Sequence, residues 1–354
     1  MKRRELSFKQ FSSVCIGLFL FLLFSISFAI TCGNADISIR EVYGVLLYEW
    51  FHIERFAEYA SGAIHDVVWL IRFPRVVLAC TIGMGLSVCG AVMQAVVKNP
   101  LADPYVLGIS SGASMGATVA ILFGIGASFG ENFIGLMAFL GAMLSSFLVL
   151  LLANVGRTMS TGKLVLVGMA MSAICSSISN FAIYMAHNQN ATSQVLFWTM
   201  GSLANAKWET IHVVLPVLFI GTIVFFIQSR TLNLMLFGEE TSITLGTNVK
   251  HMRIVFIVMT SCMVGFSVYC AGTIGFVGLV IPHAVRIVIG MDHRRLIPLS
   301  ALVGACFLVW ADVLCRTILK HSELPIGILV SMIGAPCFVY LLFRHSYGFG
   351  GKMR

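Results

Sequence analysis

Apolar stretches long enough to cross a lipid bilayer recur along nearly the whole 354-residue chain. A helix needs about 20 mostly apolar residues to span the hydrocarbon core. Charged residues make up only 11% of the chain, against roughly 25% in an ordinary soluble domain. They fall between the long apolar stretches. The pattern predicts an all-α, polytopic membrane protein, organised as one transmembrane domain over residues 1–354.

We expect about ten membrane spans. They cover residues 11–31, 73–95, 105–125, 133–154, 164–186, 209–228, 253–271, 274–290, 297–316 and 325–343. The first span follows a basic N-terminus, but it is longer than the apolar region of a signal peptide. We therefore interpret it as an uncleaved span. An even number of spans places both termini on the same side of the membrane.

The distribution of charge indicates which side that is. With both termini in the cytoplasm, 16 Lys and Arg fall inside and 7 outside, whereas 5 Asp and Glu fall inside and 10 outside. Basic residues are retained on the cytoplasmic side of membrane proteins. The asymmetry supports the span count and cytoplasmic N- and C-termini. It also explains the net charge of +8 without a nucleic-acid partner, since no basic block carries interleaved aromatic residues.

Two connections between spans contain segments that are typical of short amphipathic helices. The outer loop 32–71 contains Trp50, Phe51 and Trp69 among mixed charges, so we expect short amphipathic helices along the membrane surface. The inner segment 229–252 places a glycine, Gly238, between two short amphipathic pieces, which is typical of a helix end and restart. Such a pair of helices would make a cytoplasmic docking surface, and an ordinary loop is the alternative.

No catalytic constellation is found in the sequence. The run from Gly156 to Leu164 resembles a phosphate-binding loop, but it has one residue too many between its glycines. Leu164 also replaces the Ser or Thr that would hold magnesium. The ten Cys include no CxxC and the nine His no HExxH, so we predict neither a metal site nor a disulfide framework. We expect no catalytic residue, no metal ligand and no cofactor in this chain.

Polar residues within the spans need a reason, because burying them in the membrane is costly. In the fifth span, Gly168, Ser172, Ser176 and Ser179 are spaced by four, four and three, which places them on one helix face. Such a face either lines an aqueous path or packs against another helix.

Three arginines lie near the outer ends of spans. Asp312 and Arg316 are four residues apart in the ninth span and can form an ion pair. Arg72 and Arg75 flank Pro74 at the outer end of the second span. They either extend toward lipid headgroups or bind acidic groups of an outside partner.

Three longer motifs are more specific. Residues 72–112 read RFPRVVLACTIGMGLSVCGAVMQAVVKNPLADPYVLGISSG, residues 272–289 read GTIGFVGLVIPHAVRIVI, and residues 323–336 read ELPIGILVSMIGAP. Together with the Gly238-Glu239 … Leu245-Gly246 segment, they resemble the permease family of ATP-driven importers for iron–siderophores, haem and vitamin B12, the FecCD type of type II importer. The resemblance covers roughly residues 70–345.

The resemblance implies a ten-span subunit that forms a homodimer, or a heterodimer with a close homologue, and a translocation path along the dimer interface. Spans five and ten of the family line that path. The implied path-lining residues are Ser172, Ser176, Ser179, Gly327, Ser331 and Gly334.

The resemblance also implies two docking sites. The loop after span six docks into the ATPase subunit, and the matching residues are Leu236, Gly238, Glu239, Leu245 and Gly246. Outer arginines pair with glutamates of the substrate-binding protein, and the matching residues are Arg72, Arg75 and Arg316. Asp312 lies beside Arg316 in the sequence and weakens that last assignment.

The implied function is that of a permease in a bacterial or archaeal cytoplasmic (inner) membrane, without catalysis of its own. Two ATPase subunits would bind ATP and magnesium, and a binding protein would deliver the substrate from outside. We rank an iron(III)–siderophore first, because it is the commonest substrate of the family, with haem or vitamin B12 as the alternative. A stand-alone secondary transporter or an intramembrane enzyme would need ionisable residues within the spans that we do not find.

Overall fold

The protein is described by a computed structural model, which covers residues 7–33, 35–125, 128, 132–155, 160–237, 249–319 and 322–344. Ten apolar helices in these residues match the ten predicted spans. They are α1 (Phe8–Thr31), α4 (Phe73–Val96), α5 (Ile109–Phe123), α6 (Phe133–Asn154), α7 (Thr161–Ala186), α9 (Trp208–Ile227), α12 (Val249–Ala271), α13 (Val277–Ile289), α14 (His293–Thr317) and α15 (Ile326–Arg344). Seven are long enough to cross a bilayer, and α5, α13 and α15 are shorter. The all-α, ten-span prediction is confirmed.

The shorter elements lie in the connections. The outer loop holds α2 (Ile39–Phe51), η1 (Glu54–Tyr59), α3 (Ala63–His65) and η2 (Asp66–Arg72). Between α4 and α5 lies η3 (Pro104–Leu107), α8 (Gln189–Thr199) follows α7, and α10 (Ser229–Leu236) follows α9. The predicted outer-loop helices are therefore present. The predicted second piece of segment 229–252, beyond α10, falls largely outside the described residues.

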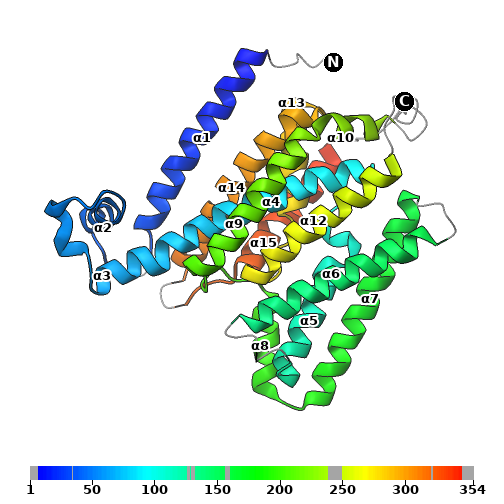
Figure 1. Cartoon of the computed structure of the whole chain (residues 1–354), viewed down its shortest axis with the longest axis horizontal. Helices are drawn as coiled ribbons and strands as arrows, with labels where there is room; N and C mark the ends of the chain where they lie inside the picture. The colour runs from blue at the N-terminus through cyan, green and yellow to red at the C-terminus, as the bar shows by residue number, and fades with distance from the viewer. Residues whose placement is uncertain are drawn as a thin grey trace.

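Helix α4 lies at the centre of the bundle. It packs against α14, α13, α9 and α12 (Figure 1), and most of its residues are buried. Two glycine pairs permit the closest approaches. A Cβ atom at Gly90 would overlap the carbonyl oxygen of Gly278 in α13, and one at Gly83 would overlap that of Gly304 in α14. Small residues at such crossings allow membrane helices to approach closely.

A second group of helices packs beside this centre. Helices α5, α6 and α7 contact one another, α8 packs on α5, and α12 joins the group to the bundle through α6. Figure 1 shows the group at the lower right, with α1 and the α2–α3 lobe on the opposite side. Helix α1 lies along α14, where the indole N–H of Trp310 donates a 2.9 Å hydrogen bond to the hydroxyl of Ser25.

The outer lobe begins with a capped helix. The backbone N–H of Glu41 donates to the Ser38 hydroxyl, and the Ser38 N–H donates to the Glu41 carboxylate at 2.7 Å, a reciprocal capping box. The hydrogen bonds from Ser38 lower the pKa of Glu41. His65 of α3 lies 3.0 Å from Glu49 of α2. These contacts hold the lobe together next to the start of α4.

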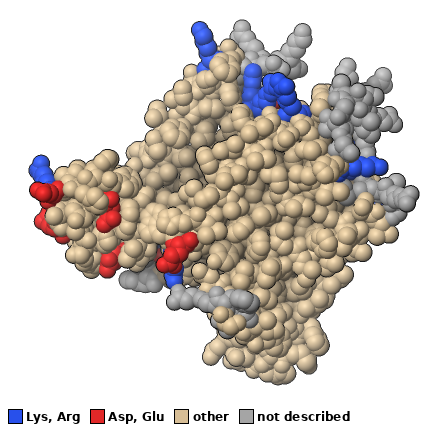
Figure 2. Space-filling view, in the orientation of Figure 1, with Lys and Arg blue, Asp and Glu red and all other residues tan. Residues whose placement is uncertain are grey.

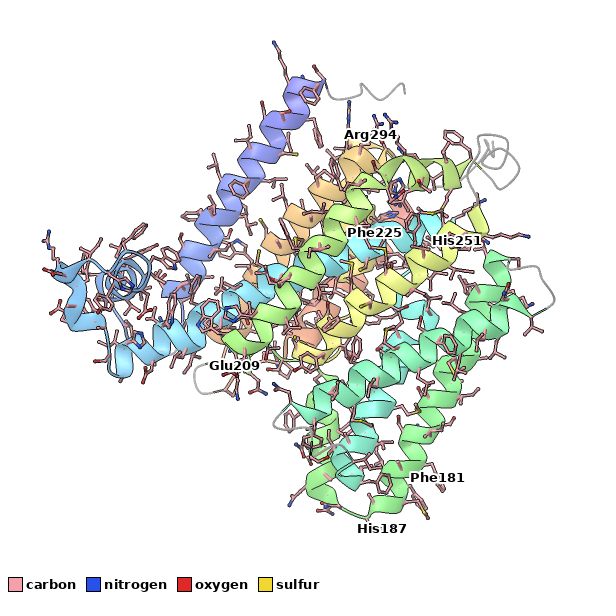
Figure 3. All side chains as sticks on the ribbon, viewed as in Figure 1. Phe181, His187, Glu209, Phe225, His251 and Arg294 are labelled. Atoms are coloured by element: carbon pink, nitrogen blue, oxygen red, sulfur yellow. The ribbon has the colours of Figure 1, made fainter. Side chains whose placement is uncertain are left out.

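The charges are segregated between the two ends of the molecule. Figure 2 shows most Lys and Arg at the edge that carries both termini, and most Asp and Glu on the α2–α3 lobe and the opposite edge. Figure 3 places Arg294 and His251 toward the first edge, and Glu209 and His187 toward the second. This polarity agrees with the predicted orientation, in which the termini lie in the cytoplasm.

Candidate functional site: a membrane path with an outer and an inner contact region

A concave pocket of about 490 Å³ lies against the first half of α15. Its walls come from η3 and α5, the end of α8, the segment before α13, and α15 itself. The lining residues are Tyr105, Ser110, Thr199, Met200, Thr273, Gly275, Gly327, Ile328, Ser331 and Met332. None of these side chains carries a charge. The wall offers hydroxyl, methionine and backbone groups, so a ligand here would meet hydrogen-bonding and apolar contacts and no ion pair.

Three chain segments are tied together at the outer end of this pocket. The N–H of Ser202 donates to the carbonyl of Ala271 at 2.8 Å, and the N–H of Gly327 donates to the carbonyl of Met200 at 3.0 Å. The hydroxyl of Thr273 donates to the carbonyl of Thr199 at 2.6 Å. These backbone contacts fix the start of α15 relative to α8 and the segment before α13.

The three path-lining residues predicted on α15 have different surroundings in the structure. Gly327 and Ser331 line the pocket. Gly334 is buried against Phe276, and a Cβ at this position would lie 2.6 Å from the Cβ of Phe276. Phe276 itself has a left-handed backbone, with φ of +65°, which is uncommon for a large side chain. The sequence analysis did not predict this role of Phe276. The glycines just before it, Gly272 and Gly275, could have indicated an irregular backbone there.

The predicted α7 face does not line this pocket. The buried stripe of α7 contains Gly168 and Ser179, and the Ser179 hydroxyl donates to the carbonyl of Cys175 at 3.0 Å. Ser172 is half-buried and Ser176 is exposed. The face therefore divides between packing and an open surface. Its exposed part, around Ser176, remains a predicted path-lining surface.

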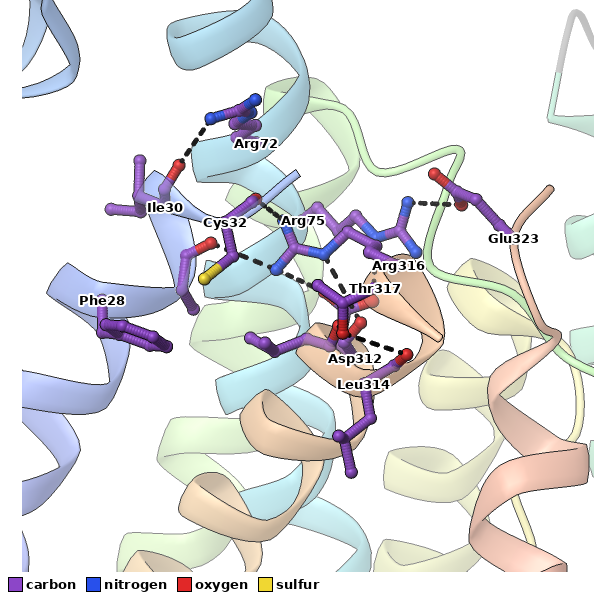
Figure 4. Close-up of polar contacts among 12 residues, drawn as sticks. Phe28, Ile30, Cys32, Arg72, Arg75, Asp312, Leu314, Arg316, Thr317 and Glu323 are labelled. Atoms are coloured by element: carbon purple, nitrogen blue, oxygen red, sulfur yellow. Dashed lines mark hydrogen bonds and ion pairs between the residues drawn. The ribbon is translucent and has the colours of Figure 1, made fainter. Parts of the chain in front are cut away.

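A cluster of buried charges lies at the outer ends of α4 and α14. The predicted pair forms, with 3.1 Å between the Arg316 guanidinium and the Asp312 carboxylate. Arg75 binds the same carboxylate at 2.8 Å and also binds Glu323, which directly precedes α15, at 2.6 Å (Figure 4). The Asp312 side chain is 1% exposed and the Glu323 side chain 43%. No local pattern could predict these contacts, because Arg75 is 237 and 248 positions from its partners.

Arg72 and Arg316 also bind carbonyls at the end of α1 and in the segment that follows it. Arg72 donates to the carbonyls of Thr31 and Ala35 at 3.1 and 2.7 Å. Arg316 donates to the carbonyls of Ala29 and Cys32 at 3.2 and 2.9 Å. A helix leaves its last four carbonyls without internal partners, and cations at that end are favoured by the helix dipole. All three predicted docking arginines are thus buried and bonded within the chain.

A small pocket of about 120 Å³ opens onto this cluster. Arg72, Arg75, Arg316 and Glu323 are among its lining residues. Glu323 also lines a larger outer pocket of about 430 Å³ beside Gln194 and Trp198. The Nη1 of Arg75 is occupied by the half-exposed carboxylate of Glu323, so an external carboxylate that bound this nitrogen would compete with Glu323.

Helix α10 is the first part of the predicted coupling segment 229–252. Leu236 is half-buried and packs on the core. The other predicted coupling residues, Gly238, Glu239, Leu245 and Gly246, lie outside the described residues. Asn233 contacts the start of α14, where its side chain bonds Asp292 and His293. Sequence reasoning missed this contact.

No group of three or more His, Cys, Asp or Glu that could hold a metal ion is found within the ranges covered by the structure.

Residues 20–344 match the model of the FecCD transport family. The chain is 40% identical to the vitamin B12 import system permease protein BtuC of Klebsiella pneumoniae, over 81% of this chain and 85% of that protein. It is 38% identical to the hemin transport system permease protein HmuU of Yersinia pestis, over 78% of this chain and 83% of that protein.

The fold also matches a solved structure. That structure is described as an inward-facing conformation of a metal-chelate type ABC transporter. The match has a TM-score of 0.80 at 27% identity and covers 94% of this chain and 100% of that one.

The family match includes the pocket beside α15, the outer charge cluster and α10. The matches identify a multi-pass membrane permease of the bacterial and archaeal type, a subunit that does not itself hydrolyse ATP. The family match therefore favours a permease subunit over the two alternatives, a stand-alone secondary transporter and an intramembrane enzyme. The chain belongs to the FecCD transport family of ABC importer permeases.

Proposed function

We propose that the chain forms the membrane path of an ATP-driven importer for a metal–tetrapyrrole compound, with vitamin B12 as the first candidate. The main support for vitamin B12 is the 40% identity to a vitamin B12 permease over most of both chains. The uncharged pocket beside α15 supports a large substrate that is not held by ion pairs. Haem is the second candidate, because a hemin permease is 38% identical. Both now rank above the iron(III)–siderophore expected from the sequence.

The path would be completed by a second copy of this chain or a close homologue. Gly327 and Ser331 line the pocket in one subunit, and Ser176 lies on an open face of α7. We assign Ser172 and Ser179 to the margin of that face and Gly334 to the packing that shapes the path. The complex would alternate between an outward-open and an inward-open state, and the substrate would cross the membrane through the cavity. ATP, bound to the ATPase subunits, would favour one of the two states.

The inner segment 229–252 of each permease copy would dock onto one of the two ATPase subunits, which carry the ATP and magnesium. Its candidate contacts are Leu236, Gly238, Glu239, Leu245 and Gly246. Reversing the charge in Glu239→Arg should prevent co-purification of the ATPase while the permease still folds. Retention of the ATPase by this variant would count against the assignment.

The substrate-binding protein would dock at the outer end by exchanging one ion pair. Arg72 and Arg316 hold the end of α1, so Arg75 is the arginine best placed to change partner. A carboxylate of the binding protein would take the place of Glu323, whose side chain is 43% exposed. That exchange would release the segment before α15.

Uptake by the reconstituted complex tests the substrate assignment. Proteoliposomes with permease, ATPase and binding protein are given ⁵⁷Co-cyanocobalamin, ⁵⁵Fe-haem and a ⁵⁵Fe-labelled siderophore in turn. We expect ATP-dependent uptake of cyanocobalamin, or of haem for the second candidate. Uptake of the siderophore alone would overturn the tetrapyrrole assignment and leave the permease assignment intact.

A further inference from the structure

The side chain of Asn233 joins α10 to the start of α14. Its Nδ2 donates to the Asp292 carboxylate at 2.7 Å. Its Oδ1 accepts the backbone N–H of His293 at 2.9 Å and lies 2.7 Å from the His293 Nδ1. Asparagine at this position therefore makes three contacts across a gap of 59 and 60 positions in the chain.

The orientation of the Asn233 amide follows from its partners. A backbone N–H can only donate, so it must face the amide oxygen, and an ionised carboxylate can only accept, so it must face the amide nitrogen. The His293 Nδ1 then carries a hydrogen and donates to the same oxygen. Aspartate or leucine at position 233 would not satisfy this set of partners.

Both ends of this junction are fixed to the core. On α10, Leu232 is 0% and Met235 1% exposed. His293 is also 1% exposed. Asp292 caps α14 by accepting the backbone N–H of Arg294 at 3.1 Å, and Figure 3 shows Arg294 at the inner edge of the molecule. Helix α10 and the first turn of α14 consequently form one packed unit.

Helix α14 connects this unit to the outer charge cluster. Its 25 residues extend about 37 Å at 1.5 Å per residue. Asp312 and Arg316 lie near its outer end, and Arg75 links Asp312 to Glu323 in front of α15. A displacement of α10 would therefore act on a helix that reaches the outer entrance.

We propose that Asn233 is a positioning residue that transmits movement of the ATPase-facing segment to α14. This inference rests on the proposed docking of segment 229–252. It assigns to Asn233 the transmission of nucleotide-driven movement and not the binding of the ATPase.

A pair of exchanges at this junction tests the role. Asn233→Asp places a second carboxylate against Asp292. Adding Asp292→Asn restores a donor–acceptor pair after a small rotation of the amide, and Asn is as good an N-cap as Asp. Asp292→Asn alone keeps an acceptor for Asn233 and is the matched control. Asn233→Ala removes the contacts without adding charge, and it replaces Asn233→Asp if that variant does not accumulate.

Trp310 provides a reporter on α14 that does not depend on the substrate. Its ring stacks on Phe28 of α1, with ring centroids 5.4 Å apart, so movement of α14 along α1 changes its surroundings. The full complex with the ATPase is labelled with 5-fluorotryptophan, and Trp310→Phe assigns the signal. The ¹⁹F spectrum is recorded with and without ATP and vanadate.

We expect the Trp310 signal to shift with nucleotide in the wild type, in Asp292→Asn and in the double variant. Asn233→Asp and Asn233→Ala should lose the shift while the ATPase still co-purifies. A wild-type shift in both single Asn233 variants, or no shift in the wild type, would overturn the inference. Loss of the ATPase from these variants would also overturn it, because Asn233 would then act in docking. Docking itself is judged separately, by Glu239→Arg.

Discussion

The buried charge cluster gives a prediction in which two carboxylates that bind the same arginine have very different effects. Asp312→Asn removes the carboxylate that compensates both Arg75 and Arg316. The two guanidinium side chains are 6% and 5% exposed, so they cannot recover their hydration. Breaking a buried pair on one side typically costs about 3–5 kcal/mol, and we expect a loss of folding free energy in that range.

Glu323→Gln removes the other partner of Arg75. The Glu323 side chain is 43% exposed, so water screens the lost charge, and exposed pairs contribute about 0–1 kcal/mol. Arg75 keeps its bond to Asp312. We therefore expect a loss of no more than about 1 kcal/mol.

Equilibrium unfolding in mixed micelles, measured for each variant, gives the two free-energy changes. Glu209→Gln, at an exposed position on α9, is the control and should lie within about 0.5 kcal/mol of the wild type. The combination of Arg75→Met with Asp312→Asn should cost less than the sum of the single changes, because the variants share one contact. Equal losses for Asp312→Asn and Glu323→Gln would refute the reasoning from burial.

Three further outcomes follow from the described contacts. Gly90→Val should prevent α4 from crossing α13, because even a Cβ atom overlaps the Gly278 carbonyl; normal yields of folded protein in detergent, judged by gel filtration, would contradict this. Ser331→Trp should fill part of the pocket of about 490 Å³ and block uptake while nucleotide hydrolysis persists; unchanged uptake would remove Ser331 from the path. Glu323→Gln should raise the affinity of the binding protein in surface plasmon resonance, because Arg75 loses a competing carboxylate; weaker binding would show that Glu323 is itself a docking group.

The resemblance to a permease family assigned roles by position, and the structure separates these roles by environment. Gly327 and Ser331 lie on the pocket wall, whereas Gly334 packs against Phe276. Spacing alone placed all three on one helix face. Helical spacing does not tell which neighbour a face meets, because that depends on segments far away in the chain.

The same holds for the arginines. Their position beside Pro74 and near the end of the ninth span pointed to the outer mouth, which is where the structure places them. The burial of all three arginines, and the bonds of Arg72 and Arg316 to carbonyls at the end of α1, come from the folded bundle, which brings α1, α4 and α14 together.

The number of spans and their orientation are properties of the sequence by itself, although α5 and α13 are shorter than the predicted spans 105–125 and 274–290. Each span must satisfy its own backbone hydrogen bonds in lipid and must cover a fixed thickness, so these features are set by local composition and by the basic residues between the spans. Contacts between distant residues were decided only by the tertiary structure. Arg75 meets Glu323, and Asn233 meets His293, because helix packing brings together side chains that no local periodicity relates.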